Sequence, residues 1–370
     1  MTTAAPATSR PKPESRKAPF GAHSTGRRDW ATWPRYEAAA LGLRNYWYPV
    51  TWSRKVGRSP VPVLLCGERL SLVRDGDVLR AVRVGVEADG SSQSEVSYAS
   101  YPVAERIGIV WVFLGEPTED GPPPVETDIP SELLAADAVV DGRLTHRHGN
   151  WRFGAENGID EGHAKFLHRR SLWTLRRQMP TWTRHHMEPT GEGWITRKPD
   201  EVHYESSFPG LGVWPPRRFW RSKGRGVAVV SIRLPCFLRV AYPSAGWQHY
   251  EWWVPTDPEH HIYLQLISRR GSLLRRVRFR FFYRLWTRWV FHGMFNDEDR
   301  LMVDVMDAPP ERLYRPDIAI TEWRKLCESD SRGTPQGLTP EFASWQPSVE
   351  PLDPRAELPI THRLRELIGL

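Results

Sequence analysis

Between residues 46 and 115, short apolar segments alternate with turn signals, and this pattern constrains the fold more than any other feature of the chain. The clearest segments are 61–65, 70–74, 78–83 and 109–114. Pairs such as Asp75-Gly76 separate them and are typical of tight turns between antiparallel strands. The polar stretch 84–100 lacks the pattern and predicts a loop. The sequence therefore predicts a small β unit, preceded by a short helix in the stretch WPRYEAAALGL.

Strands and helices mix in the rest of the chain. A proline-rich linker, 116–130, leads into a segment that favours helix at 150–168, and 250–254 and 262–266 favour strands. We therefore expect an α+β protein. The expected division is a disordered basic tail at 1–30, a β domain at 31–125, a second domain at 126–335 and a C-terminal tail at 336–370.

Composition narrows the class of protein. Among 370 residues, 18 are Trp and 26% are charged, and no apolar run reaches the roughly 18 residues that a membrane span needs. Only three cysteines are present, too few for a disulfide framework or a four-thiolate metal site, which favours a reducing cytoplasm. The first 30 residues lack the apolar core of a secretory signal, and a disordered tail is favoured over a transit peptide. A net charge of +7 is compatible with an acidic partner.

A basic and aromatic segment, 272–295, predicts a long helix. At 100° per residue, a stripe of apolar residues falls on one face: Leu274, Val277, Phe281, Leu285 and Trp289. We expect this stripe to pack on the core and the arginines to face solvent. Three alternatives are an acidic ferredoxin, a partner subunit or a lipid surface as the binding partner of this helix. Nucleic acid is not expected, because no recognisable binding module accompanies the arginines.

The segment 150–168 carries the residues typical of a metal site. Asp160 and His163 are three apart and share a helix face, with Asn157 about one turn earlier. His168 is five beyond His163, so a helix that presents both imidazoles to one ion must end or distort between them. Two imidazoles and one carboxylate form the facial triad of non-haem Fe(II) oxygenases. The alternative is two surface histidines and a capping aspartate.

A third ligand must then come from elsewhere in the chain. The segment 295–303 offers two carboxylates, Asp297 and Asp299. Spacing alone does not choose between them.

Several separated segments, in the same order, resemble the α subunits of Rieske-type ring-hydroxylating oxygenases of the carbazole dioxygenase kind. They are GLRNYWYPV at 42–50, LCGERL at 65–70, YPVAERIGIVWV at 101–112, the 150–168 segment, 250–255, 295–299 and 316–326. The resemblance covers about Leu41 to Gln336. It implies a helix-grip (Bet v 1-like) α+β catalytic domain with an antiparallel sheet, packed beside a Rieske-like all-β domain that is degenerate here.

The resemblance also implies roles for individual residues. His163, His168 and Asp299 would hold mononuclear Fe(II), with Asp297 as the competing carboxylate. Asp160 would orient His163 through its free ring nitrogen and bridge to a cluster histidine of the neighbouring subunit. Asn157 would line the iron pocket.

One expected feature of the family is missing. A Rieske cluster needs two cysteines and two histidines. Between His23 and His146 the chain has no histidine, and its single cysteine there is Cys66. We therefore predict that this chain binds no [2Fe–2S] cluster.

A subunit with the iron but without the cluster must take electrons from another molecule. We expect a catalytic subunit that uses O2 to hydroxylate a small apolar aromatic or polycyclic substrate. Its donor would be a cluster-bearing homologous subunit, a ferredoxin or a reductase, in a trimer-based hetero-oligomer. The alternative is a non-catalytic structural subunit of such an assembly, which would bind no iron.

Overall fold

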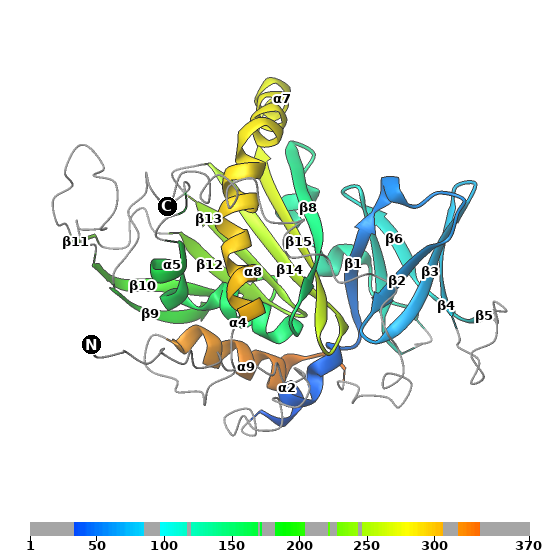
Figure 1. Ribbon diagram of the computed structural model, residues 1–370, viewed down its shortest axis with the longest axis horizontal. Helices are drawn as coiled ribbons and strands as arrows, with labels where there is room; N and C mark the ends of the chain where they lie inside the picture. Colours follow the sequence, from blue (N-terminus) through cyan, green and yellow to red (C-terminus); the bar gives the residue numbers. More distant parts are fainter. Residues whose placement is uncertain are drawn as a thin grey trace, which may run out of the picture.

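The computed structural model describes two β units and a set of helices (Figure 1). It describes residues 33–84, 97–116, 120–168, 171, 182–203, 221–222, 228–242, 246–305 and 317–333. The tails predicted at 1–30 and 336–370 lie outside these residues. The α+β class with antiparallel sheets, predicted from the sequence, is confirmed.

The first β unit holds two small antiparallel sheets, with strand orders β1-β7-β6 and β2-β3-β4-β5. The strands are β1 (Tyr46–Trp52), β2 (Val61–Leu65), β3 (Glu68–Asp75), β4 (Val78–Val84), β5 (Ser97–Tyr101), β6 (Val103–Arg106) and β7 (Ile109–Leu114). The predicted strands are therefore present. The prediction of a loop over all of 84–100 is wrong at both ends, because Val84 pairs with Ser97 and extends the sheet. The intervening residues 85–96 lie outside the described part.

The second unit is an eight-stranded antiparallel sheet in the order β11-β10-β12-β13-β14-β15-β8, with β9 also paired to β10. Its strands are β8 (Ala138–His148), β9 (Trp182–Pro189), β10 (Ile195–His203), β11 (Arg221–Ser222), β12 (Val229–Arg233), β13 (Phe237–Tyr242), β14 (Trp247–Asp257) and β15 (His260–Arg270). The two longest inner strands, β14 and β15, are almost wholly buried. Apolar and β-branched residues along them favour a strand packed on both faces.

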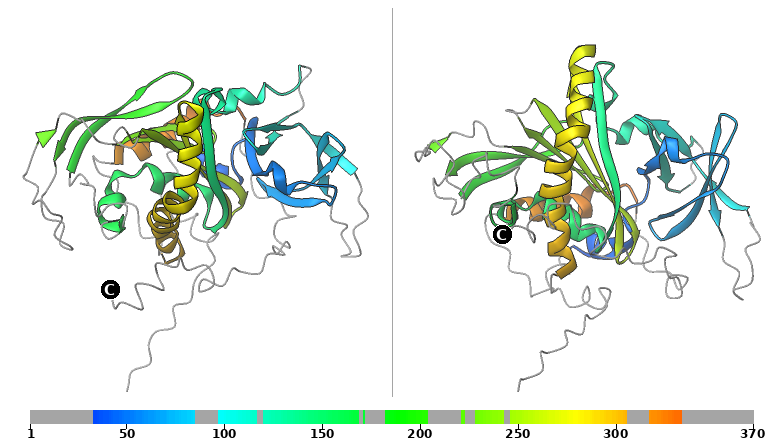
Figure 2. Two further views of the ribbon diagram at one scale, coloured as in Figure 1. Left: turned by 90° about the horizontal axis from the view of Figure 1, so that it is seen from above. Right: turned by 45° about the horizontal axis from the view of Figure 1, so that its top comes forward.

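Helices lie against this sheet (Figures 1 and 2). One long helical rod runs across it as three consecutive stretches, α7 (Leu273–Phe282), the π-helical η7 (Tyr283–Phe295) and α8 (Asn296–Val305). The remaining helices are α2 (Pro34–Ala38), η3 (Ala39–Leu41), η4 (Ser53–Lys55), η5 (Val125–Asp128), α3 (Ser131–Leu134), α4 (Trp151–Ile159), α5 (Glu161–Leu167) and α9 (Ile318–Asp330).

The two β units share one hydrophobic core. Trp111 of β7 packs edge-on against Trp252 of β14, with ring centroids 6.0 Å apart. The turn between β2 and β3 also bonds to the large sheet, since the Cys66 N–H donates to the Pro255 carbonyl at 2.9 Å. A domain boundary near residue 125 stays a prediction, but the two parts are packed together rather than separated by the linker.

A buried ion pair attaches the last helix to α4. The Arg324 guanidinium, fully buried, donates to both carboxylate oxygens of Glu156 at 2.9 Å each, and the Tyr36 hydroxyl donates to one of them at 2.8 Å. Removing one member would leave an uncompensated buried charge, which is strongly destabilising. These contacts therefore hold α2 and α9 against α4, the first helix of the segment 150–168.

Two pairs of adjacent histidines lie on strands of the large sheet. They are His185-His186 on β9 and His260-His261 on β15. Because neighbouring strand residues point to opposite faces, one member of each pair is buried, His185 and His261. Trp252 and Trp253 on β14 are core residues.

The long helix also departs from the expectation. Its apolar stripe faces outward: Leu274, Phe281 and Trp289 are 78%, 60% and 52% exposed. The residues that pack on the sheet are instead Phe279, Tyr283 and Val290. Within the described part of the chain, no helix is both long enough and apolar enough to cross a bilayer.

Candidate metal centre

The segment 150–168 forms two helices with a break at one residue. Asn150 caps α4, its side chain accepting from the Arg152 N–H. Asp160 then adopts an extended conformation (φ −65°, ψ 123°), which ends α4 and begins α5. Its carboxylate accepts from the N–H groups of Gly162 at 2.7 Å and His163 at 3.2 Å. An aspartate at this position satisfies N–H groups that otherwise lack partners.

Close packing fixes α4 on the sheet. A Cβ atom added to Gly154 or Gly158 would lie 2.4 Å from the Trp253 ring of β14. The two glycines are four residues apart and therefore share a helix face, so this face approaches the indole directly. Any side chain at either position would push α4, and with it the break at Asp160, away from the sheet.

The two histidines come from the second helix and its end. His163 lies in α5, and the helix ends at Leu167, so His168 is the first residue beyond it. The predicted interruption between them is therefore present, and it lets the ring centroids approach to 5.3 Å. His163 is partly buried and His168 fully buried, which argues against two surface histidines.

The ring orientation of His163 is set by main chain rather than by a carboxylate. Its Nδ1 lies 2.6 Å from the Asp160 carbonyl oxygen. The expectation that the Asp160 carboxylate orients this ring is wrong, because both carboxylate oxygens cap α5. Since a carbonyl can only accept, Nδ1 carries the proton and Nε2 presents a lone pair.

The third donor comes from α8. Asp299 Oδ1 lies 3.2 Å from His168 Nε2 and 3.5 Å from His163 Nε2. The Asn157 amide of α4 donates to the same oxygen at 3.0 Å. One donor atom from each of the three residues lies within 4.8 Å of the others, and no second such group is found among the described residues.

His168 has a carboxylate at each ring nitrogen. Nδ1 lies 2.9 Å from Glu298 Oε2, and the ring stacks on Phe295 with centroids 3.9 Å apart. Burial lowers the pKa of His168, but Asp299 and Glu298 outweigh it and raise the pKa to about 9. Burial likewise raises the pKa of Asp299, while the imidazoles and Asn157 lower it more, so the carboxylate pKa lies below its usual value. The pocket thus favours a positive charge between the imidazoles and the carboxylate.

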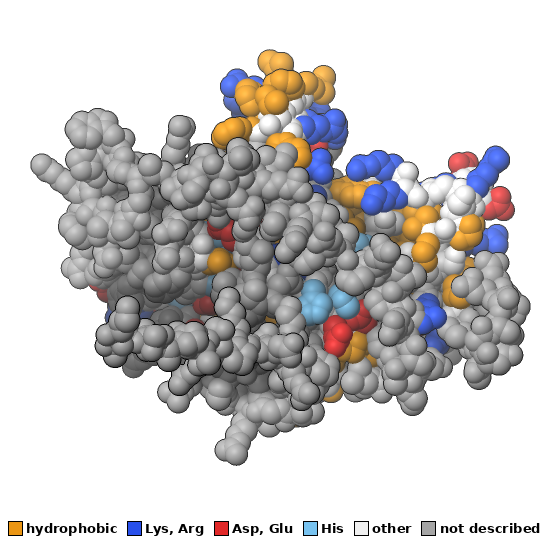
Figure 3. All heavy atoms as spheres, viewed as in Figure 1, with side chains coloured by type: hydrophobic (Ala, Val, Ile, Leu, Met, Phe, Trp, Pro, Cys, Tyr) orange, Lys and Arg blue, Asp and Glu red, His pale blue; other side chains and the backbone are white. Residues whose placement is uncertain are grey.

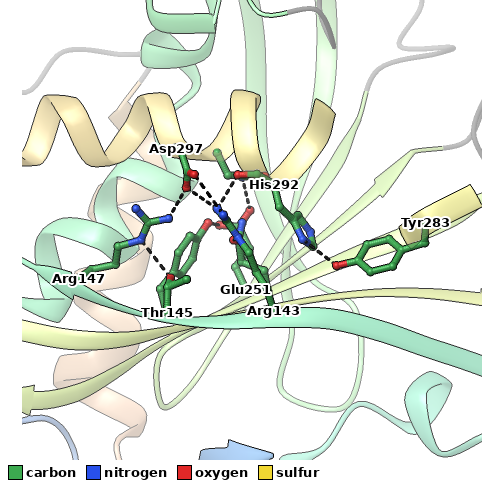
Figure 4. A network of polar contacts seen from close by, with 10 residues as sticks. Arg143, Thr145, Arg147, Glu251, Tyr283, His292 and Asp297 are labelled. Atoms are coloured by element: carbon green, nitrogen blue, oxygen red, sulfur yellow. Dashed lines mark hydrogen bonds and ion pairs between the residues drawn. The ribbon is translucent and has the colours of Figure 1, made fainter. Parts of the chain in front are cut away.

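The competing carboxylate, Asp297, forms ion pairs with two arginines and does not face the histidines (Figure 4). The guanidinium groups of Arg143 and Arg147, both on β8, hold its two oxygens. Arg143 also donates to Gln265 at 2.6 Å and to the His292 carbonyl. Burial raises the pKa of Asp297, but the two arginines lower it further. Asp297 therefore ties α8 to the sheet, and its neighbour two residues on is left to face the histidines.

The donor set fits a ferrous ion. Metal-ligand bonds of about 2.1 Å that meet at right angles separate the donors by about 3.0 Å, close to the spacings found here. Two neutral imidazoles and one carboxylate leave positions open for other ligands, as in the facial triad. Sequence reasoning missed Glu298 and Phe295, which support His168, because only the fold brings α8 to the end of α5.

Comparisons with known proteins identify the family to which the chain belongs. A sequence model described as a homotrimeric ring hydroxylase matches residues 113–335, more than half of the chain. The terminal oxygenase component of carbazole 1,9a-dioxygenase from Sphingomonas sp is 27% identical over 378 residues, covering 84% of this chain and 97% of the relative. The 3-chlorobenzoate-3,4-dioxygenase oxygenase subunit of Comamonas testosteroni is 28% identical over 34% of this chain and 38% of its own length.

Solved structures of oxygenases have the same fold as this chain. The terminal oxygenase of carbazole 1,9a-dioxygenase from Novosphingobium sp. KA1 superposes with a TM-score of 0.65 at 27% identity, over 84% of this chain and 99% of that one. A reduced complex between oxygenase and ferredoxin in carbazole 1,9a-dioxygenase matches with a TM-score of 0.67 at 22% identity, over 86% of this chain and 97% of that one, a likeness of fold.

Proposed function

Because this chain belongs to the homotrimeric ring hydroxylase family, we propose that His163, His168 and Asp299 hold one mononuclear ferrous ion and that the chain is the oxygenase subunit of a ring-hydroxylating system. The resemblance inferred from the sequence is confirmed by the family match. The observation that carries the proposal is the convergence of His163 Nε2, His168 Nε2 and Asp299 Oδ1. A ferrous ion bound there supplies the activation of dioxygen.

The surrounding residues hold the three donor side chains in place. The Asp160 carbonyl fixes the tautomer of His163, and Glu298 accepts from Nδ1 of His168. Asn157 holds Asp299 through the oxygen that faces the histidines. Such partners behind the ligands orient them and tune the affinity of a metal site.

We further propose that this subunit has no [2Fe–2S] cluster and takes its electrons from a separate protein. The support is the ligand count, because the interval that would supply two cysteines and two histidines contains only Cys66. Cys66 itself is buried, and burial raises the pKa of its thiol to about 12, which disfavours the thiolate that a cluster requires. Complexes with ferredoxin are known for the carbazole 1,9a-dioxygenase oxygenase, so a ferredoxin or a cluster-bearing homologous subunit is the proposed donor.

Asp160 is the proposed point of contact for that donor. Its carboxylate caps α5, three residues before His163, and the residue is only partly buried. Asp160→Asn tests this role, because asparagine removes the charge but keeps one acceptor oxygen for the cap of α5. We expect iron to stay bound and its reduction by the donor to slow about tenfold or more; unchanged reduction kinetics would argue against Asp160. The proposed substrate is a small apolar aromatic or polycyclic molecule, the class to which carbazole belongs.

Metal analysis of the full-length chain tests the proposal. After anaerobic loading with Fe(II) and removal of free metal, we expect about one iron per chain and no acid-labile sulfide. Acid-labile sulfide in the purified chain would refute the absence of a cluster. A chain that binds no iron would refute the oxygenase site and leave a structural subunit. Dioxygen uptake with carbazole as the probe should require an added ferredoxin and reductase.

A further inference from the structure

The exposed apolar surface of the described chain is concentrated on one helical stretch. Nine large hydrophobic side chains are highly exposed, and eight of them lie between residues 273 and 289; the ninth is Val78 of β4. The eight are Leu273, Leu274, Val277, Phe281, Phe282, Leu285, Trp286 and Trp289. Isolated exposed apolar residues need no explanation, but a contiguous group of this kind marks an interaction site.

The same stretch carries a high density of positive charge. Residues 272–296 contain six arginines and no acidic residue. Five of the arginines are exposed, Arg275, Arg278, Arg280, Arg284 and Arg288. The guanidinium of Arg278 lies over the Phe282 ring and that of Arg288 over the Trp289 ring. Cationic and aromatic side chains therefore share one surface rather than occupying opposite faces.

The placement of the helix leaves this surface accessible. In α7 only Phe279 is buried, so most of the surface of this helix is left open. Figures 1 and 2 show α7 projecting beyond the edge of the sheet, and Figure 3 shows orange and blue side chains gathered on the projecting end. A flat surface could therefore contact α7 without displacing any other described element.

We propose that α7 and the first half of η7, residues 273–289, form a binding surface for anionic phospholipid bilayers. Arginines attract anionic headgroups, while Trp, Phe and Leu enter the boundary between headgroups and acyl chains. A helix with this composition lies in the interface plane and does not span the bilayer. This inference concerns the surface of the chain and does not depend on the iron site.

A second copy of the chain fits this surface less well. Packing two such helices against each other would oppose arginines to arginines without an acidic residue between them. A head-to-tail contact would require a complementary apolar patch elsewhere, and Val78 is the one other highly exposed large hydrophobic residue in the described part of the chain. Charge complementarity therefore favours an anionic surface.

Vesicle sedimentation with the full-length, iron-loaded chain tests the proposal. We expect binding to vesicles of phosphatidylcholine mixed with phosphatidylserine, little binding to phosphatidylcholine alone, and weaker binding as NaCl rises from about 0.1 to about 0.5 M. Equal sedimentation with both kinds of vesicle, or none with either, would overturn it.

Two double variants locate the surface. Arg275→Gln with Arg280→Gln should weaken binding about 30-fold, since each arginine near an anionic surface contributes about a factor of five. Phe281→Glu with Trp286→Glu should also reduce binding, whereas Val78→Glu, at the exposed residue outside the patch, should not. If the double variants bind as the parent does, the helix is not the surface.

Light scattering on the same variants tests whether a second copy of the chain covers this surface instead. We expect the same molecular mass for the parent and all variants. A lower mass for either double variant would show that the helix is a contact between copies and would refute the lipid proposal. The glutamine variant keeps the test valid if the glutamate variant fails to fold.

Discussion

The two ends of the long helical rod, Leu273–Val305, differ in almost every physical respect. At the α8 end, the three acids of the first turn all have partners on other elements: Asp297 with two arginines, Glu298 with His168, and Asp299 with both histidines and Asn157. At the α7 end, arginines and large apolar residues are exposed together. The same rod therefore has acidic residues paired with other elements at its α8 end and exposed basic and apolar residues at its α7 end.

The difference follows from what lies beneath each end. At the α8 end, β8 supplies Arg143 and Arg147, α4 supplies Asn157, and α5 with the residue after it supplies the two histidines of the candidate site. At the other end, Phe279 is the first residue of α7 to be buried, and the residues before it remain at least partly exposed. The neighbouring elements decide which end forms a site and which remains a surface.

The largest expected effect is at the acid that faces the histidines. Asp299→Ala should abolish iron binding, because it removes one of the three donors and leaves the two imidazoles without their carboxylate partner. Iron content after anaerobic loading is the measurement. Asp330→Ala, an exposed aspartate at the end of α9, is the matched control and should bind iron as the parent does. Full iron occupancy in Asp299→Ala would show that the ligand is another residue.

The next effect concerns the ion pairs between α8 and β8. Asp297→Ala should lower the free energy of unfolding by about 3–5 kcal/mol, since Arg143 and Arg147 would be left buried without a counter-charge. Urea unfolding followed by circular dichroism measures it. Asp297→Asn retains hydrogen bonds to both arginines and should cost less. A loss below about 1 kcal/mol for the alanine variant would mean that the rod is held chiefly by its apolar contacts.

These local contacts also show where sequence reasoning ends. Turn pairs and short apolar runs predicted the small β unit, and the five-residue spacing of His163 and His168 predicted a helix end between them. Both follow from local backbone geometry. The partners Glu298 and Asn157 of the site lie far apart in sequence, and no periodicity could show that they approach His168 and Asp299.

The prediction that the apolar stripe of the long helix packs on the core is wrong for a different reason. Periodicity identified a face, with Leu274, Phe281 and Trp289 on it, but it does not say what that face contacts. The structure packs Phe279 and Tyr283 on the sheet instead and leaves the stripe outside. The π-helical geometry of η7 also changes the angle per residue, so positions beyond Tyr283 drift from a 100° projection.

A smaller effect is expected at the residue behind His168. Glu298→Leu should weaken iron binding about 10- to 100-fold, because Nδ1 of His168 would lose its acceptor and the ring its orientation. Competition with a chelator of known affinity measures the change. Glu298→Gln offers an amide oxygen in place of the carboxylate and should recover part of the affinity. Equal affinities for the leucine variant and the parent would show that Phe295 alone orients the ring.

The smallest expected effect is at the exposed end. Phe281→Ala should change the free energy of unfolding by less than about 0.5 kcal/mol and leave iron content unchanged, because its ring is 60% exposed and its loss creates no cavity. Phe279→Ala, two residues earlier on the same helix, should instead cost about 3 kcal/mol, since that ring is only 7% exposed against the sheet.

This pair isolates the contrast between the two sides of the helix, because residue type and helical propensity are the same at both positions. Urea unfolding measured in dilute protein, without vesicles, is the suitable test. If Phe281→Ala destabilises the chain as much as Phe279→Ala does, the outward face is covered in the free protein. The exposed patch would then be part of the folded core or of an assembly, and a lipid surface would have nothing to contact.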